Sequence, residues 1–113
     1  MISALFPAFV PFIASGVDVA VRDAAELRQA VAGAKPGTRI LLAAGNYGGG
    51  FHFAKLRGAK DRPIVIAAAD PKAPPVFSDA KVAMHLSAPA FVELHGLTFT
   101  NLSVNGLNID DGG

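Results

Sequence analysis

Three histidines are the side chains of this sequence best suited to proton transfer near neutral pH. His52 and His85 each stand between two apolar residues, and His95 directly precedes a glycine. Because a strand turns every second side chain outward, each histidine is explained as the outward member of a strand or turn. The order of residues also contains no Ser-His-Asp pattern, no HxxxH metal motif and no phosphate loop. We therefore predict no catalytic residue in this segment.

Oxygen-bearing side chains gather close to the last residues of the chain. Asn108, Asp110 and Asp111 offer amide and carboxylate oxygens at an expected turn, and Ca²⁺ prefers ligands of this kind. These three residues are our candidate metal ligands. The alternative interpretation is a solvated polar turn, which needs no ion.

Charged residues also gather in an expected loop, at Lys55, Arg57, Lys60, Asp61 and Arg62. A solvated loop is the simplest explanation of such a run. The alternative is contact with an acidic glycan, since four of the five side chains are cationic at neutral pH.

Composition limits the classes of protein to which the chain can belong. Its 113 residues allow one domain at most, and a hydrophobic share of 51% against 17% charged residues argues against disorder. A net charge of +1 without a Lys/Arg cluster argues against nucleic acid as a partner. The absence of cysteine excludes disulfides and thiolate zinc sites.

The first sixteen residues are uncharged and apolar, and they end in the small residues ASG. We predict an export signal at 1–16, with a mature protein that begins near Val17 and is secreted, periplasmic or on the cell surface. Sixteen residues interrupted by Pro7 and Pro11 are too few for a helix to cross about 30 Å of hydrocarbon, so we predict no membrane span. The alternatives are an apolar first strand and a wrongly assigned start codon.

The next segment carries the signals of one short amphipathic helix over 23–34. Asp23 followed by Glu26 forms a capping box, and apolar residues recur at helical spacing after it. Pro36 and Gly37 mark the end of this helix.

Everything after the helix consists of short β-prone runs, at 40–42, 63–66, 91–94 and 97–100, separated by turn residues. Glycines 48–50 lack the context of a phosphate loop and are expected to form a corner. Apolar residues recur in two interleaved series. The first has intervals of 24, 22 and 21 residues, and its members are Ile40, Ile64, Leu86 and Leu107. The second has intervals of 23 and 21 residues, and its members are Phe53, Val76 and Leu97. One period near 22 predicts a solenoid, with an antiparallel sandwich as the alternative.

Several stretches are familiar in this order: AELRQAVAGAKPGTRILLAAGNY at 25–47, RPIVI at 62–66, FVELHGLTF at 91–99 and NGLNI at 105–109. Together they resemble the start of the chondroitinase B and alginate lyase family, with pectate-lyase-like proteins more distant. The resemblance covers residues 23–113 and is specific for a fold rather than for a reaction. The family has an acidic residue where this chain has Thr38.

The resemblance implies an all-β fold, a right-handed parallel β-helix with a short N-terminal capping α-helix. Residues 17–113 would then be the cap and first coils, following the signal at 1–16. Asparagines are expected to stack at the corners, with Asn101, Asn105 and Asn108 as candidates. The expected core is aliphatic and consists of Ile40, Ile64, Ile66, Leu86, Leu94, Leu107 and Ile109.

The resemblance also implies a function. Lyases of this kind act on uronic acids with a Lys or Arg base and a cation, often Ca²⁺, all held in middle coils that cannot be matched here. We therefore expect the N-terminal part of a secreted protein that acts on or binds acidic polysaccharide, by elimination or hydrolysis, with no complete active site in this segment. No cofactor is expected in the segment itself, and Ca²⁺ belongs to the longer protein. The alternative is a non-catalytic surface or adhesive scaffold.

Two further expectations follow from the β-helix interpretation. The chain would be a fragment or truncated gene product, because it ends without a second cap. Its uncapped C-terminal coil would then self-associate through exposed strand groups.

Overall fold

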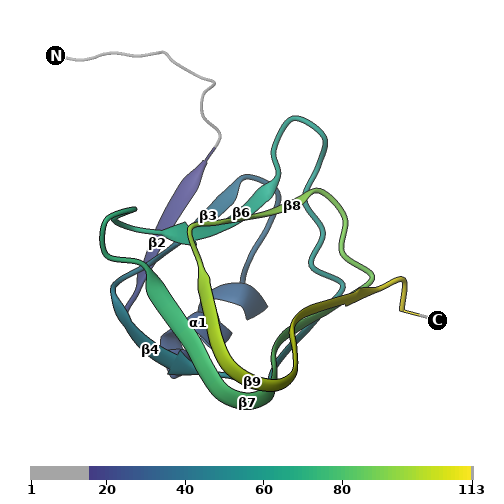
Figure 1. The fold of residues 1–113 in the computed structure, drawn as a ribbon. Helices are drawn as coiled ribbons and strands as arrows, with labels where there is room; N and C mark the ends of the chain where they lie inside the picture. Colours follow the sequence, from purple (N-terminus) through teal and green to yellow (C-terminus); the bar gives the residue numbers. More distant parts are fainter. Residues whose placement is uncertain (1–15, 113) are drawn as a thin grey trace, which may run out of the picture.

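A computed structural model describes residues 16–112 of the chain (Figure 1). The elements, in chain order, are β2 (Val17–Val21), α1 (Ala24–Ala32), β3 (Thr38–Leu42), β4 (Gly45–Gly48), β5 (Phe51–Ala54), β6 (Ile64–Ala68), β7 (Pro75–Ser87), β8 (Val92–His95) and β9 (Thr98–Asp110). Within residues 16–112, the strands with a single short helix confirm the predicted all-β class. The expected export signal lies outside the described residues, apart from Gly16. No helix of the described part is long and apolar enough to cross a membrane.

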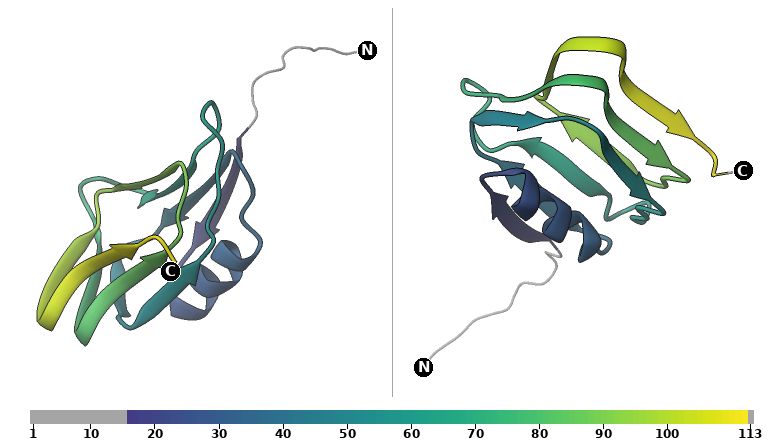
Figure 2. Two further views of the ribbon diagram at one scale, coloured as in Figure 1. Left: turned by 90° about the vertical axis from the view of Figure 1, so that its right-hand side faces the viewer. Right: turned by 90° about the horizontal axis from the view of Figure 1, so that it is seen from below.

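The described strands form two sheets, and all of the pairings between these strands are parallel. The first sheet has the order β2-β3-β6-β8. In the second sheet, β4 and β5 lie along one edge of β7, and β9 lies along its other edge. After β3 the chain visits the two sheets in turn, so that successive passages lie on one another as layers (Figure 2).

The register between layers differs from the one that the intervals predict. In the first sheet Ile40 pairs with Ile66, whereas Ile64 pairs with Val92. Leu86 lies in the second sheet, so the predicted series from Ile40 through Ile64 to Leu86 joins two different sheets and is wrong. The second series is also wrong at its start, because Phe53 pairs with Leu86 and not with Val76. The loops between strands differ in length, and one fixed interval therefore cannot follow the register.

Helix α1 begins and ends close to where the sequence predicts. Asp23 is the N-cap, and its carboxylate accepts a hydrogen bond from the Glu26 backbone N–H at 2.9 Å. Glu26 reaches back to the backbone N–H of Arg22 at 2.8 Å, one residue earlier than in an ideal capping box. The helix stops at Ala32, with Gly33 as its C-cap, two residues before the predicted end.

The helix lies at the β2 end of the stacked layers (Figure 2). Its buried face carries Leu27 and Val31, which belong to the same core as the strands. The first layer of strands is thus covered by helical side chains at that end.

The core lies between the sheets and is partly aromatic. The rings of Tyr47, Phe51 and Phe99 surround that of Phe77 at centroid distances of 5.5, 5.5 and 5.7 Å. The expected core residues Ile40, Ile64, Ile66 and Leu86 are buried.

Burial falls toward the last layer. Leu94 and Leu107 are only partly buried, although they pack against the core. Ile109 is 60% exposed, so its assignment to the core is wrong. It pairs with the buried Leu86 on one side, and no described strand covers β9 on the other.

Glycine, asparagine and aspartate form one series of corners. Residues 48–50 make the corner between β4 and β5, as expected, and a Cβ on Gly49 would lie 2.6 Å from the Cβ of Ala80. At the next corner Asp79 and Asn101 both have left-handed backbone conformations, and the Asn101 amide donates to the Asp79 carboxylate across the layers. The predicted asparagine stack is thus a mixed one, since Asn105 bonds within β9.

Candidate functional site

Polar side chains from three layers meet on the outer face of the second sheet. The register places His52 beside His85, and His85 beside Asn108. Two residues further along the strands, Ser87 lies beside Asp110. Because side chains two apart in a strand share a face, these groups project together. We call His52, His85, Ser87 and Asp110 the histidine cluster.

Hydrogen bonds join the members of the histidine cluster. The Nε2 of His52 lies 2.9 Å from the Oγ of Ser87, and the two imidazole rings are 4.6 Å apart between centroids. The Nε2 of His85 bonds to Oδ2 of Asp110. Ser87 Oγ also lies 3.5 Å from both of these atoms. A single hydroxyl is therefore surrounded by two imidazoles and a carboxylate.

The charge of Asp110 determines how the cluster is protonated. Its pKa lies below the ordinary value, chiefly because His85 donates a hydrogen bond to it and also because the Gly112 backbone N–H does so at 2.8 Å. An ionised carboxylate only accepts, so Nε2 of His85 must carry the proton. A serine nucleophile needs its acid and its hydroxyl on opposite nitrogens of one imidazole. Here Ser87 and Asp110 both approach Nε2 of His85, so the cluster differs from a catalytic triad.

We predict that His85→Phe raises the pKa of Asp110 toward its ordinary value. A carboxylate with a lowered pKa adds stability above its ordinary pKa and loses that contribution as the pH falls through the lowered one. The variant should therefore lose less stability between neutral and acidic pH. An NMR titration of the Asp110 carboxyl carbon measures the pKa directly.

His95→Phe is the matched control, because His95 bonds to Glu93 at 2.8 Å on the first sheet. It should leave the pKa of Asp110 where it is. Equal shifts in both variants would show that the cluster does not set this pKa.

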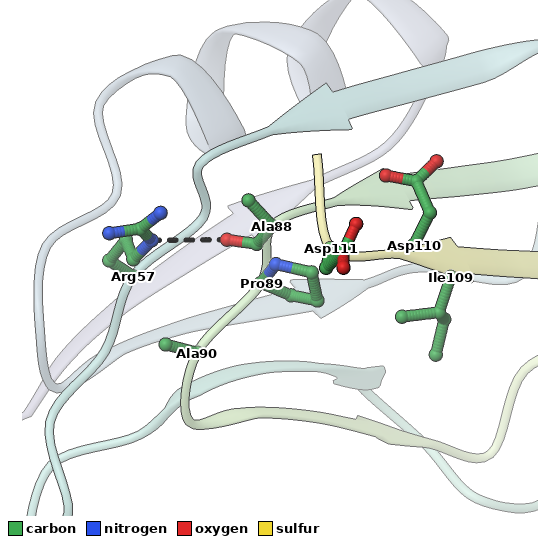
Figure 3. A pocket seen from close by; sticks show the side chains of 7 residues that line it. All are labelled: Arg57, Ala88, Pro89, Ala90, Ile109, Asp110 and Asp111. Carbon is green, nitrogen blue, oxygen red and sulfur yellow. Dashed lines mark hydrogen bonds between the residues drawn. The ribbon is translucent and has the colours of Figure 1, made fainter. Parts of the chain in front are cut away.

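A shallow pocket of about 700 Å³ adjoins the cluster at the end of β9 (Figure 3). We call it the end pocket, and its lining residues are Arg57, Ala88, Pro89, Ala90, Ile109, Asp110 and Asp111. Arg57 is held in place because its Nε donates to the carbonyl of Ala88 at 3.0 Å. Figure 3 shows Asp110 and Ile109 leaving opposite faces of β9. The pocket thus combines a fixed guanidinium with carboxylates, which suits a ligand with hydroxyl groups.

The predicted calcium ligands lie together at the end of β9, but their oxygens have internal partners. Oδ1 of Asn108 accepts from the amide of Asn105 at 2.8 Å. Asp110 accepts from His85 and from Gly112. Among residues 16–112, no three His, Cys, Asp or Glu side chains are grouped so that they could hold a metal ion. Ca²⁺ binding at Asn108, Asp110 and Asp111 stays a prediction.

The charged residues of the loop do not lie together. Arg57 lines the end pocket, whereas Lys55 lies at the rim of a groove beside α1. The remaining three charged residues, 60–62, are exposed in a turn that Ala59 and Arg62 close with backbone hydrogen bonds of 3.0 Å.

The histidine cluster is the feature that motif analysis misses. Its signal is a repeated short pattern, FHFA at 51–54 and MHLS at 84–87, in which a histidine stands between apolar residues. The structure pairs these four positions one to one. Aligning the patterns would have placed the two histidines side by side.

Comparison with known proteins gives a family match. A protein-family model described as Chondroitinase B matches residues 21–111. No curated protein matches the chain.

Proposed function

The chain belongs to the chondroitinase B family, and we propose that it forms the first coils of a right-handed parallel β-helix that binds acidic polysaccharide. The family match carries this proposal, because it spans all described elements from α1 to β9. Parallel pairing in both sheets supports the β-helix. In such a fold each passage of the chain adds one strand to each sheet.

The outer face of the second sheet supports binding rather than catalysis. Elimination beside a uronic acid needs a base near the sugar carbon and a group that neutralises the carboxylate. In the histidine cluster the Nε2 proton of His85 points at Asp110, whose negative charge repels a second carboxylate. We propose that these residues contact sugar hydroxyls and do not by themselves complete an active site.

The same proposal accounts for location and assembly. Acidic polysaccharides of this kind lie outside the cell, which agrees with the expected export signal at 1–16 and with a secreted, periplasmic or surface protein. The partly buried last layer, with Val104 and Ile109 exposed, is where we propose that copies of the chain associate.

Binding of the purified chain to chondroitin sulfate, alginate and pectate tests the proposal, with neutral dextran as the control. We expect binding to at least one acidic polymer, weakened severalfold at about 1 M salt, where the Debye length is about 3 Å. We expect no rise in the absorbance of unsaturated products. Equal affinity for dextran, or no binding to any acidic polymer, would contradict the proposal. Turnover that tracks the protein would show that the residues of this chain do complete an active site.

A further inference from the structure

We infer that the groove between α1 and β5 binds the acidic group, carboxylate or sulfate, of a single sugar residue. We call it the helix groove. It is separate from the end pocket, and the inference rests on the proposed function for its ligand class. The residues that line it are Arg28, Val31, Ala32, Ala34, His52, Phe53, Ala54, Lys55 and Leu56.

The size and charge of the helix groove fit such a ligand. Its volume is about 380 Å³, within the range of small-molecule sites. Arg28 and Lys55 supply two cations, and no lining residue is acidic. The end pocket contains Asp110 and Asp111, which disfavour an anion there. An acidic sugar therefore gains more from the helix groove than from the end pocket.

Arg28 packs over an aromatic ring. Its guanidinium carbon lies 4.4 Å from the centre of the Phe51 ring, and this ring is almost fully buried. A guanidinium stacked on a ring keeps its N–H groups available for a carboxylate or a sulfate. The Arg–carboxylate ion pairs of the described part join Arg22 with Glu26 and Arg39 with Asp18, so they leave Arg28 outside them.

Lys55 occupies a position where its backbone is strained. Its φ is 57°, and its backbone N–H donates to the carbonyl of Ser87 at 2.8 Å. One layer on, Ala88 has nearly the same φ of 54° and makes the equivalent bond to Asp110. The corner thus needs this conformation but not a long side chain. A left-handed backbone is unfavourable for every residue with a Cβ, so a lysine here is better explained by its ammonium group than by the corner.

The floor of the helix groove is apolar. Val31, Phe53 and Leu56 are buried and belong to the core. A sugar ring has an apolar face as well as polar edges, and this floor can receive that face. Two cations beside an apolar floor match a charged sugar better than a free inorganic anion, which has no apolar face to bury.

The test uses three small probes on the full chain: glucuronate, a sulfated N-acetylgalactosamine and glucose. Amide NMR shifts should move at residues 28–34 and 52–56 with one or both acidic sugars, and not with glucose. Shifts with glucuronate alone would assign the groove to carboxylates, and shifts with the sulfated sugar alone to sulfates. No shift with either, or shifts confined to the end pocket, would overturn the inference.

Two variants sharpen the test. Lys55→Gly removes the ammonium and relieves the strained backbone, so it should fold at least as stably while binding the acidic sugar roughly tenfold more weakly. Arg28→Met keeps a long side chain over Phe51 and should weaken binding similarly. Lys60→Gly, an equal change of charge in the exposed turn, is the control and should bind as the unchanged chain does.

The test of the helix groove can fail while the test of the proposed function succeeds, and the reverse is also true. If acidic polymers bind but Lys55→Gly weakens binding no more than Lys60→Gly, the helix groove is excluded while the proposed function stands. If no acidic polymer binds, the proposed function fails, and the small sugars still decide whether the groove is a site.

Discussion

Phe77→Ala is expected to lower the free energy of unfolding by about 3 to 5 kcal/mol. Phe77 is fully buried, and its ring is the centre of the aromatic core. It stacks on Tyr47 from β4, meets Phe51 from β5 edge to face, and does the same with Phe99 from β9. One side chain thus joins three successive layers of the second sheet. Its removal would leave a cavity against three rings that belong to separate strands and cannot close together.

Urea unfolding followed by circular dichroism measures this change. Phe91→Ala is the matched control, because it deletes the same atoms from a side chain that is 55% exposed. Its effect should stay within about 0.5 kcal/mol. Similar losses for the two variants would show that the aromatic core does not hold the layers together.

The elements that are determined by contacts between residues close together in the chain could be predicted from the sequence. Asp23 caps the helix because its carboxylate reaches an N–H only three residues away, and such local contacts leave a readable pattern. The strand cores near Ile40, Ile64 and Val92 are likewise marked by local apolar runs. Aspartate is a residue type typical of turns, and Asp79 does form a corner, but the strand continues through it, so β7 extends over Pro75–Ser87.

The register between layers could not be predicted in the same way. The register depends on the number of residues in each loop, and loops on a surface tolerate large differences in length. Phe53 pairs with Leu86, 33 positions later, whereas Val76 pairs with Thr98, 22 positions later. A single interval near 22 describes the last step and misses the earlier one.

The candidate site depends on that register. The neighbours of Asp110 in the chain predict a calcium ligand, yet its side-chain hydrogen-bond partner is His85 from another layer. Motif analysis compares residues at short spacing, whereas a parallel stack brings together residues from successive passages of the chain. The histidine cluster and the helix groove are both of this second kind, since Arg28 and Lys55 meet only when α1 packs beside β5.

Gly58→Ala is expected to lower the free energy of unfolding by about 3 kcal/mol. A Cβ on Gly58 would lie 2.5 Å from the carbonyl oxygen of Phe91, 2.8 Å from the nitrogen of Ile64 and 3.0 Å from the Cα of Pro63. All three are backbone atoms, so none can rotate away as a side chain could. The Ile64 nitrogen donates to that same carbonyl at 2.9 Å, and Gly58 itself donates to the Ala90 carbonyl at 2.8 Å. The methyl group can fit only if the loop withdraws from Phe91 and Ile64 and these hydrogen bonds break.

Gly50→Ala separates this crowding from the general effect of replacing glycine. Gly50 has a φ of 75°, and nothing lies within 4 Å of an added Cβ, so its variant should lose only about 1 kcal/mol through backbone strain. Urea unfolding of both variants gives the comparison, and amide shifts along β8 should change in Gly58→Ala alone. A loss in Gly58→Ala no larger than in Gly50→Ala would show that the loop does not approach Phe91 and Ile64 this closely. Because Arg57 directly precedes Gly58 and lines the end pocket, withdrawal of the loop should also displace its guanidinium from the Ala88 carbonyl. The stability loss should therefore come with weaker binding of sugar hydroxyl groups at the end pocket, which the backbone strain of Gly50→Ala would not produce.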